Sequence, residues 1–156
     1  MTYSHRRRVE FRDTDAAGIV HFSVFFPMME EAEHAALRSV GLSVMEPDAS
    51  GGHWTWPRVA ATCDYITAAR FEDRLRIEVS VVKIGTTSVT YAFHFFRDDP
   101  IADAAADPAL RPLASGTLTA VCCHFAADRS LQKRPIPPDV RERLLRLAAP
   151  ASLDRP

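Results

Sequence analysis

Residues 11–22 of the chain read Phe11-Arg12-Asp13-Thr14-Asp15-Ala16-Ala17-Gly18-Ile19-Val20-His21-Phe22. From there on, apolar residues recur at steps of three and four, a spacing that predicts a helix with a wide apolar face. Pro27 belongs in the first turn of a helix, so we expect the helix to begin between Ser23 and Phe26, and Gly41 is a typical stop signal. The apolar residues at this spacing are Phe22, Phe25, Met29, Ala32, Ala36 and Val40.

Two carboxylates, Asp13 and Asp15, stand on a turn just ahead of this helix. Unpaired N–H groups at a helix N-terminus carry partial positive charge. A carbonyl group placed between the two would be polarised by the amides and attacked with the help of the carboxylate. The alternative is an Asx turn, in which the two aspartates only accept hydrogen bonds from nearby amides. The residue types alone favour this simpler role.

Length and composition predict one globular domain, residues 1–150, followed by a frayed tail, residues 151–156. Hydrophobic residues make up 47% and charged residues 25% of the chain, as is usual for globular proteins. The net charge of −1 points to neither a nucleic acid nor a membrane partner, and no apolar stretch is long enough to span a bilayer. Three cysteines, with Cys122 and Cys123 adjacent, argue against a disulfide framework, so we expect a cytoplasmic protein.

Strand-like segments lie on both sides of the long helix. Alternation is clearest in residues 73–84, where the apolar residues are expected to face inward. Glycine, proline and aspartate mark residues 43–56 as a loop and residues 98–112 as a surface insertion. One antiparallel sheet must then cover the apolar helix, because no other element is large enough to do so. The expected strands are 8–12, 57–67, 73–84, 87–97 and 113–125, with a last helix within 135–147.

The segment from Asp13 to Phe22 resembles the hot-dog-fold thioesterases of the 4-hydroxybenzoyl-CoA thioesterase family. The resemblance extends over residues 9–147 and is strongest in the first third. It includes the branch of 1,4-dihydroxy-2-naphthoyl-CoA hydrolases and small acyl-CoA thioesterases. It implies an α+β hot-dog fold, in which an antiparallel five-stranded sheet wraps round a long central helix. It also implies a homodimer or homotetramer with active sites at the subunit interface.

The same resemblance assigns roles to single residues. Asp15 matches the catalytic carboxylate, which acts as nucleophile or general base. Phe22 matches the position whose backbone N–H polarises the thioester carbonyl. Asp13 and Gly18 are expected to support the turn. His21 and Phe25 are candidates for the acyl pocket; the alternatives are a satisfied histidine at a strand–helix junction and a core phenylalanine.

The phosphates of coenzyme A require basic residues near the mouth of the pocket. The late cluster Arg129, Lys133 and Arg134 is one candidate, and Lys83 and Arg70 are others, although basic runs usually form a solvated edge. The six histidines show no metal-ligand spacing, so no metal is expected. No Gly-x-Ser-x-Gly turn, P-loop or dinucleotide glycine motif is present.

These features predict a hydrolase that converts an acyl-CoA and water to a free acid and CoA, without a metal or redox cofactor. The acyl group, aromatic or short to medium in length, is not fixed by the sequence, and carrier-protein thioesters are also open. One alternative is an acyl-thioester hydratase or dehydratase of the same fold, whose usual Asp–His motif is not found. Another is a non-catalytic acyl-CoA-binding module, against which the complete motif around Asp15 argues.

Overall fold

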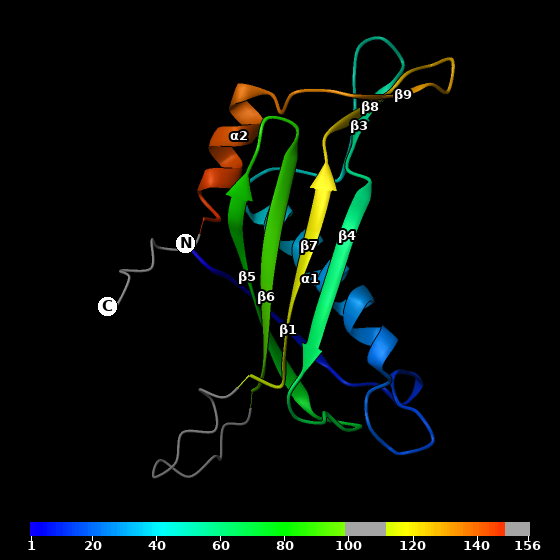
Figure 1. Cartoon of the computed structure of the whole chain (residues 1–156), viewed down its shortest axis with the longest axis vertical. Coiled ribbons are helices and arrows are strands. Elements are labelled where there is room, and N and C mark those ends of the chain that lie inside the picture. Colours follow the sequence, from blue (N-terminus) through cyan, green and yellow to red (C-terminus); the bar gives the residue numbers. More distant parts are fainter. Residues whose placement is uncertain (99–111, 149–156) are drawn as a thin grey trace.

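The computed structural model describes residues 1–98 and 112–148. Helix α1 (Phe25–Ser39) lies along one face of a sheet of long strands, and α2 (Pro138–Leu145) lies near one end of that sheet (Figure 1). Two short 3₁₀ turns, Phe11–Asp13 and Phe22–Val24, precede α1. The strands are β1 (Tyr3–Arg8), β2 (Met45–Pro47), β3 (His53–Thr55), β4 (Arg58–Tyr65), β5 (Arg74–Ile84), β6 (Ser88–Arg97), β7 (Ala114–Val121), β8 (Cys123–Phe125) and β9 (Leu131–Lys133).

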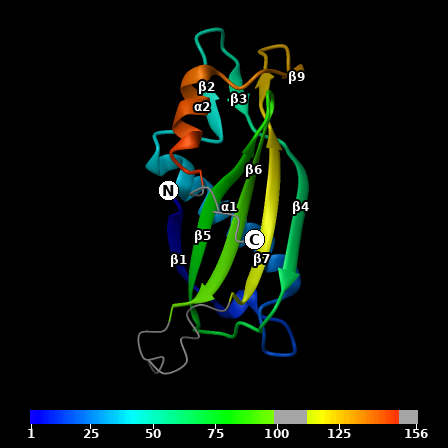
Figure 2. The ribbon, with the colours of Figure 1, turned by 60° about the vertical axis from the view of Figure 1, so that its left-hand side comes forward.

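The main sheet has five strands in the order β1-β5-β6-β7-β4, and every neighbouring pair is antiparallel. This confirms the expected antiparallel five-stranded sheet around a long central helix. Figure 2 shows the sheet curving past the helix, with β1 and β4 at its two edges. The expected insertion at residues 98–112 and the tail at 151–156 fall almost entirely outside the described residues.

The core lies between α1 and the inner face of this sheet. Leu75, Ile77 and Val79 are fully buried along β5, as their alternation predicted. Met29 of α1 packs over Gly116 of β7, where a Cβ atom would lie only 2.6 Å from the Met29 Cε. A larger residue at position 116 would displace the Met29 side chain and clash with the Thr62 carbonyl of β4, which also lies 2.6 Å from that place.

Both ends of α1 agree with the sequence. The helix begins at Phe25, inside the expected range, with Pro27 in its first turn. At the other end Gly41 has a φ of +72°, and the Leu42 N–H donates to the Leu37 carbonyl at 2.9 Å. This left-handed glycine closes the helix as predicted.

The first strand was predicted at residues 8–12, which is wrong: β1 covers Tyr3–Arg8 instead. Val9 is buried as expected, but Phe11 is 78% exposed in the first 3₁₀ turn. The chain turns there because the Asp13 carboxylate accepts the Glu10 N–H at 2.9 Å. The arginine-rich segment before it pairs with β5 along its whole length.

The prediction of a plain loop at residues 43–56 is also wrong. Strands β2 and β3 form a hairpin there, and it belongs to a second, four-stranded sheet of order β2-β3-β8-β9. The predicted continuous strand at 113–125 is likewise divided between the two sheets, as β7 and β8. Trp54 of β3 pairs with His124 of β8. Because these two strands are distant in the sequence, local spacing did not reveal the second sheet.

One charged side chain of α1, Glu33, is fully buried. Its carboxylate lies 2.5 Å from the guanidinium of Arg58 on β4, and Arg58 also donates to the Trp56 carbonyl. Burial raises the pKa of Glu33 to about 7, although the charge of Arg58 opposes this shift. Among the described residues, the second Glu33 oxygen, Oε1, has no hydrogen-bond partner. The ion pair thus ties β4 to the helix at an electrostatic cost.

The Glu33 pKa predicts how stability changes with pH. Because it is raised from 4.5 to about 7, the folded protein binds more protons than the unfolded chain in this range. The contribution of Glu33 to the free energy of unfolding should fall as pH rises from about 4.5 to 7, by up to about 3 kcal/mol, and then level off. Glu33→Gln should remove this fall. Denaturant unfolding at several pH values measures the free energy of unfolding, and Glu142→Gln on the exposed face of α2 is the control. If this free energy changed with pH in parallel for the wild type and Glu33→Gln, the prediction would be contradicted.

Candidate active site

A closed turn connects β1 to α1. The Asp15 N–H donates to the Ile19 carbonyl at 2.9 Å, and the Gly18 N–H donates to the Asp15 carbonyl at 2.9 Å. Gly18 has a φ of +73°, and nothing lies within 4 Å of the place where a Cβ would be. The glycine is therefore required for the left-handed backbone rather than for space.

Asp15 is half-buried within this turn. Its Oδ1 accepts the Ala17 N–H at 2.8 Å, which is the Asx-turn hydrogen bond that the sequence left as an alternative. Its Oδ2 makes no hydrogen bond to any of the described residues. One oxygen thus fixes the carboxylate in place, and the other remains available for a reacting group.

Asp13 has a different environment from Asp15. It is buried, lies 2.5 Å from the guanidinium of Arg7, and also accepts the Glu10 N–H. Its backbone carbonyl accepts the His21 N–H at 2.9 Å. These contacts brace the turn from inside, and Asp13 does not line the neighbouring cavity.

A cavity of about 260 Å³ opens beside Asp15. The Phe25 side chain is buried in its wall, and its ring centroid lies 5.3 Å from that of Tyr65. Phe22 is 61% exposed, and its carbonyl accepts a hydrogen bond of 3.0 Å from the Tyr65 hydroxyl. The cavity thus joins the turn, the start of α1 and the end of β4. Its lining residues are Asp15, Ile19, Val20, Phe22, Phe25, Tyr65, Ile66, Thr67, Ala68 and Ala69.

Phe22, which lines this cavity, stands at the entrance of α1. Phe22 is the first residue of the second 3₁₀ turn, and its N–H donates to no acceptor in residues 1–98 and 112–148. The next N–H, that of Ser23, makes only a long contact of 3.4 Å with the His21 Nδ1. Unpaired amides at the start of a helix favour negative charge on a bound group.

His21 lies beside the cavity but is not one of its lining residues. Its Nδ1 is 2.8 Å from the Ser23 Oγ, and its side chain caps the 3₁₀ turn. Its ring also packs on Phe22, with centroids 4.5 Å apart. In the single chain these contacts favour the interpretation of His21 as a hydrogen-bonded histidine at the strand–helix junction over its role in the acyl pocket.

Most of the basic residues proposed to bind the phosphates of CoA lie far from Asp15 within one chain. Lys83 ends β5 near its hairpin, and Arg129, Lys133 and Arg134 belong to the β8–β9 region. Both places lie at the end of the sheet opposite the Asp15 turn (Figure 1). Arg70, in contrast, forms a β-bridge with Ile19 and so stands next to that turn.

Sequence reasoning missed one wall of the cavity, the segment from Tyr65 to Ala69. This segment is held against the turn by the hydrogen bond from the Val20 N–H to the Ala69 carbonyl, at 2.8 Å. It follows β4 in the chain, and nothing in its composition marks it as part of a site. Only the fold, which places the end of β4 beside the start of α1, shows the connection.

The described residues contain no group of three or more His, Cys, Asp and Glu side chains arranged to hold a metal ion. The three cysteines are free; Cys122 and Cys123 are buried, whereas Cys63 is only half-buried. Burial raises the pKa of Cys122 to about 11 and keeps the thiol neutral. No helix in the described part of the chain has the length and apolar character needed to cross a membrane.

Comparison with known proteins gives related matches in sequence and in structure. A 1,4-dihydroxy-2-naphthoyl-CoA hydrolase of Synechococcus elongatus is 34% identical over 83 residues, which are 53% of this chain and 61% of that relative. A solved 1,4-dihydroxy-2-naphthoyl-CoA thioesterase from Synechocystis superposes with a TM-score of 0.72 at 26% identity and covers 100% of both chains. A solved gentisyl-coenzyme A thioesterase gives a TM-score of 0.71 at 28% identity, with 91% of this chain and 99% of that one covered.

The family model described as the thioesterase superfamily matches residues 17–103, more than half of the chain. The matched segment begins within the turn that carries Gly18, includes all of α1 and extends past β6. Together with the five-stranded sheet around α1, this match settles the family. The chain belongs to the thioesterase superfamily and has its hot-dog fold.

Proposed function

We propose that the protein hydrolyses an acyl-CoA thioester to a free acid and CoA, in the cavity beside Asp15. The observation that carries this proposal is the pairing of two groups at one cavity. Asp15 offers a carboxylate with one free oxygen, and the entrance of α1 offers the unpaired N–H of Phe22. A nucleophile or base opposite a donor for a developing oxyanion is the arrangement that acyl transfer requires.

Two routes satisfy this geometry. In the first, the Asp15 oxygen bonds to the thioester carbon, the C–S bond breaks and CoA leaves as thiolate; water then hydrolyses the mixed anhydride. In the second, Asp15 takes a proton from a water molecule while the water oxygen bonds to the carbon, and the proton passes to the departing sulfur. In both routes the Phe22 N–H stabilises the negative carbonyl oxygen.

An aromatic acyl group suits this cavity. Phe22, Phe25 and Tyr65 supply aromatic surface around it, and aromatic rings pack favourably edge-to-face with such groups. The two solved relatives reported above are named for aromatic acyl-CoA substrates. Arg70, which forms a β-bridge with Ile19 of the turn, would stand close to the CoA portion of the substrate.

We infer a homo-oligomer that is joined through β4. This strand is an edge of the main sheet, and the apolar residues on and just after it are open to solvent. Val59, Tyr65 and Ile66 are 62%, 48% and 56% exposed. Open apolar edges are sites of association. Since Tyr65 and Ile66 also line the cavity, a second subunit placed here would close it and could bring the distant Lys83 or Arg134 of another copy towards the phosphates of CoA.

Asp15→Asn tests the catalytic proposal. The asparagine Oδ1 can still accept the Ala17 N–H, so the turn and the fold should persist. Turnover should fall by about 10²–10⁴-fold, because the amide is neither a nucleophile nor a base. Thiol release from a panel of aromatic and aliphatic acyl-CoAs measures the loss.

Asp128→Asn is the matched control for this experiment, since Asp128 accepts the Ser130 N–H at 2.9 Å in a similar turn. That turn lies between β8 and β9, away from the cavity, and its variant should retain full activity. Hydrolysis by Asp15→Asn within threefold of wild type would refute the role of Asp15. Binding or acyl-chain modification by the wild type without thiol release would instead support a binding module or a hydratase.

Val59→Asp tests the interface. A carboxylate on the exposed edge would have to be buried at a β4–β4 contact, so the oligomer should dissociate at concentrations at which the wild type stays assembled. Sedimentation velocity measures the change. Val82→Asp is the control, because Val82 is also exposed, at 53%, but lies on β5. An unchanged oligomer in the Val59 variant would show that β4 is not the contact.

A further inference from the structure

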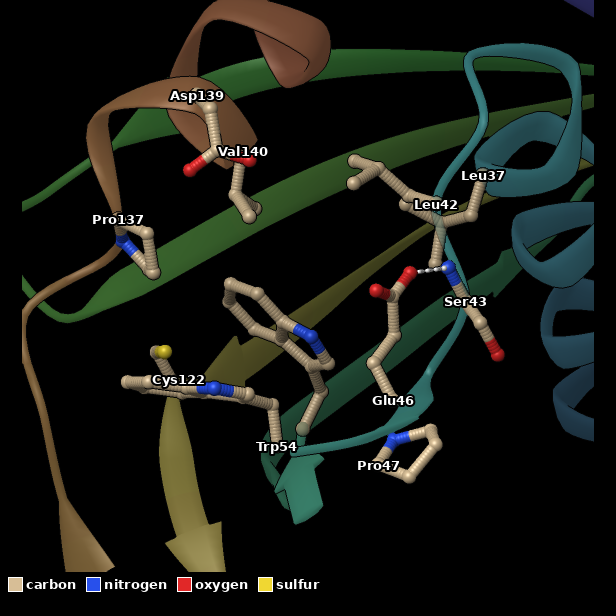
Figure 3. A pocket seen from close by; sticks show the side chains of 11 residues that line it. Leu37, Leu42, Ser43, Glu46, Pro47, Trp54, Cys122, Pro137, Asp139 and Val140 are labelled. Carbon is tan, nitrogen blue, oxygen red and sulfur yellow. Dashed lines mark hydrogen bonds between the residues drawn. The ribbon is translucent and has the colours of Figure 1, made fainter. Parts of the chain in front are cut away.

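A second pocket, of about 380 Å³, lies at the opposite end of α1 from Asp15. Figure 3 shows it enclosed by Leu37 and Leu42 at the end of the helix, by Trp54 of β3, and by Val140 of α2. It shares no lining residue with the cavity beside Asp15. Its volume is within the usual range for small-molecule sites.

Two indole rings form the main walls of this pocket, those of Trp54 and Trp56. The Trp54 ring is held edge-to-face against His124, with centroids 5.5 Å apart. The Trp56 carbonyl accepts a hydrogen bond of 2.5 Å from Arg58, which fixes the backbone at that position. The walls are thus already in place before any ligand binds.

The charged groups of the pocket are both carboxylates, Glu46 and Asp139, and no Lys or Arg is among its described lining residues. Glu46 Oε1 accepts the Ser43 N–H at 2.9 Å (Figure 3). Its Oε2 makes no hydrogen bond to any residue that the structure describes. Asp139, the other carboxylate, pairs with Arg143 at 3.3 Å.

This charge decides which ligands suit the pocket. An acyl-CoA, a free acid or a phosphate would bring negative charge beside Glu46, which is unfavourable. A neutral ring would take water from the carboxylate without replacing its hydrogen bonds. An organic cation with an apolar body satisfies both features, because indole faces attract cations and the carboxylate pairs with them.

We propose that the pocket between the β2–β3 hairpin and α2 is a second binding site, for a small organic cation such as an aromatic or alkyl ammonium compound. The site is separate from the thioesterase cavity. It therefore remains testable whatever the substrate of the enzyme proves to be.

The chain contains only two tryptophans, and both line this pocket, so intrinsic fluorescence reports on it directly. Benzyltrimethylammonium should change the tryptophan emission in a saturable way. Its uncharged carbon isostere, neopentylbenzene, should bind about tenfold more weakly or worse. Phenylacetate and CoA should leave the emission unchanged at the same concentrations.

Glu46→Gln is the decisive variant, because the amide oxygen can keep the hydrogen bond from Ser43 while the charge is lost. Affinity for benzyltrimethylammonium should fall about tenfold. Glu142→Gln, an exposed charge elsewhere on α2, and Asp15→Asn should both bind the cation like wild type. Equal binding of the neutral isostere, binding of phenylacetate, an unaffected Glu46→Gln variant, or no emission change at millimolar cation would each overturn the proposal.

Discussion

The buried ion pair between Arg7 and Asp13 holds together the segments that form the candidate active site. Arg7 comes from β1, Asp13 from the turn, and a second contact of 2.9 Å joins Arg7 to Glu31 of α1. The Arg7 and Asp13 side chains are only 11% and 8% exposed, so neither charge could be left alone without a large penalty. The position of Asp15, two residues further on, follows from this contact.

The sequence predicted the parts of the fold that depend on local spacing. The helix and the alternating strand at 73–84 were found because burial of one face shows in the order of residues. The first strand was misplaced because its pairing with β5, which is distant in the sequence, does not show in the local order of residues. The β2–β3 hairpin was missed for the same reason, since its partner strand begins at Cys123.

The candidate site was predictable only in part. Asp15, Gly18 and Phe22 belong to one short segment whose sequence resembles the motif of a known family. That segment folds into the turn beside the cavity. The wall from Tyr65 to Ala69 carries no such signal and depends on how β4 meets the helix. The basic residues proposed for CoA illustrate the limit further, because a single chain places all of them except Arg70 at the other end of the sheet.

The hydrogen bond between the Tyr65 hydroxyl and the Phe22 carbonyl links the end of an edge strand to the peptide next to the proposed oxyanion donor. In the proposed oligomer, the strand that meets the neighbouring subunit also steadies the catalytic backbone. Because the single chain already forms this hydrogen bond, dissociation on dilution would leave the Phe22 peptide in place but open the cavity at Tyr65 and Ile66. The specific activity of such an enzyme would then depend on protein concentration.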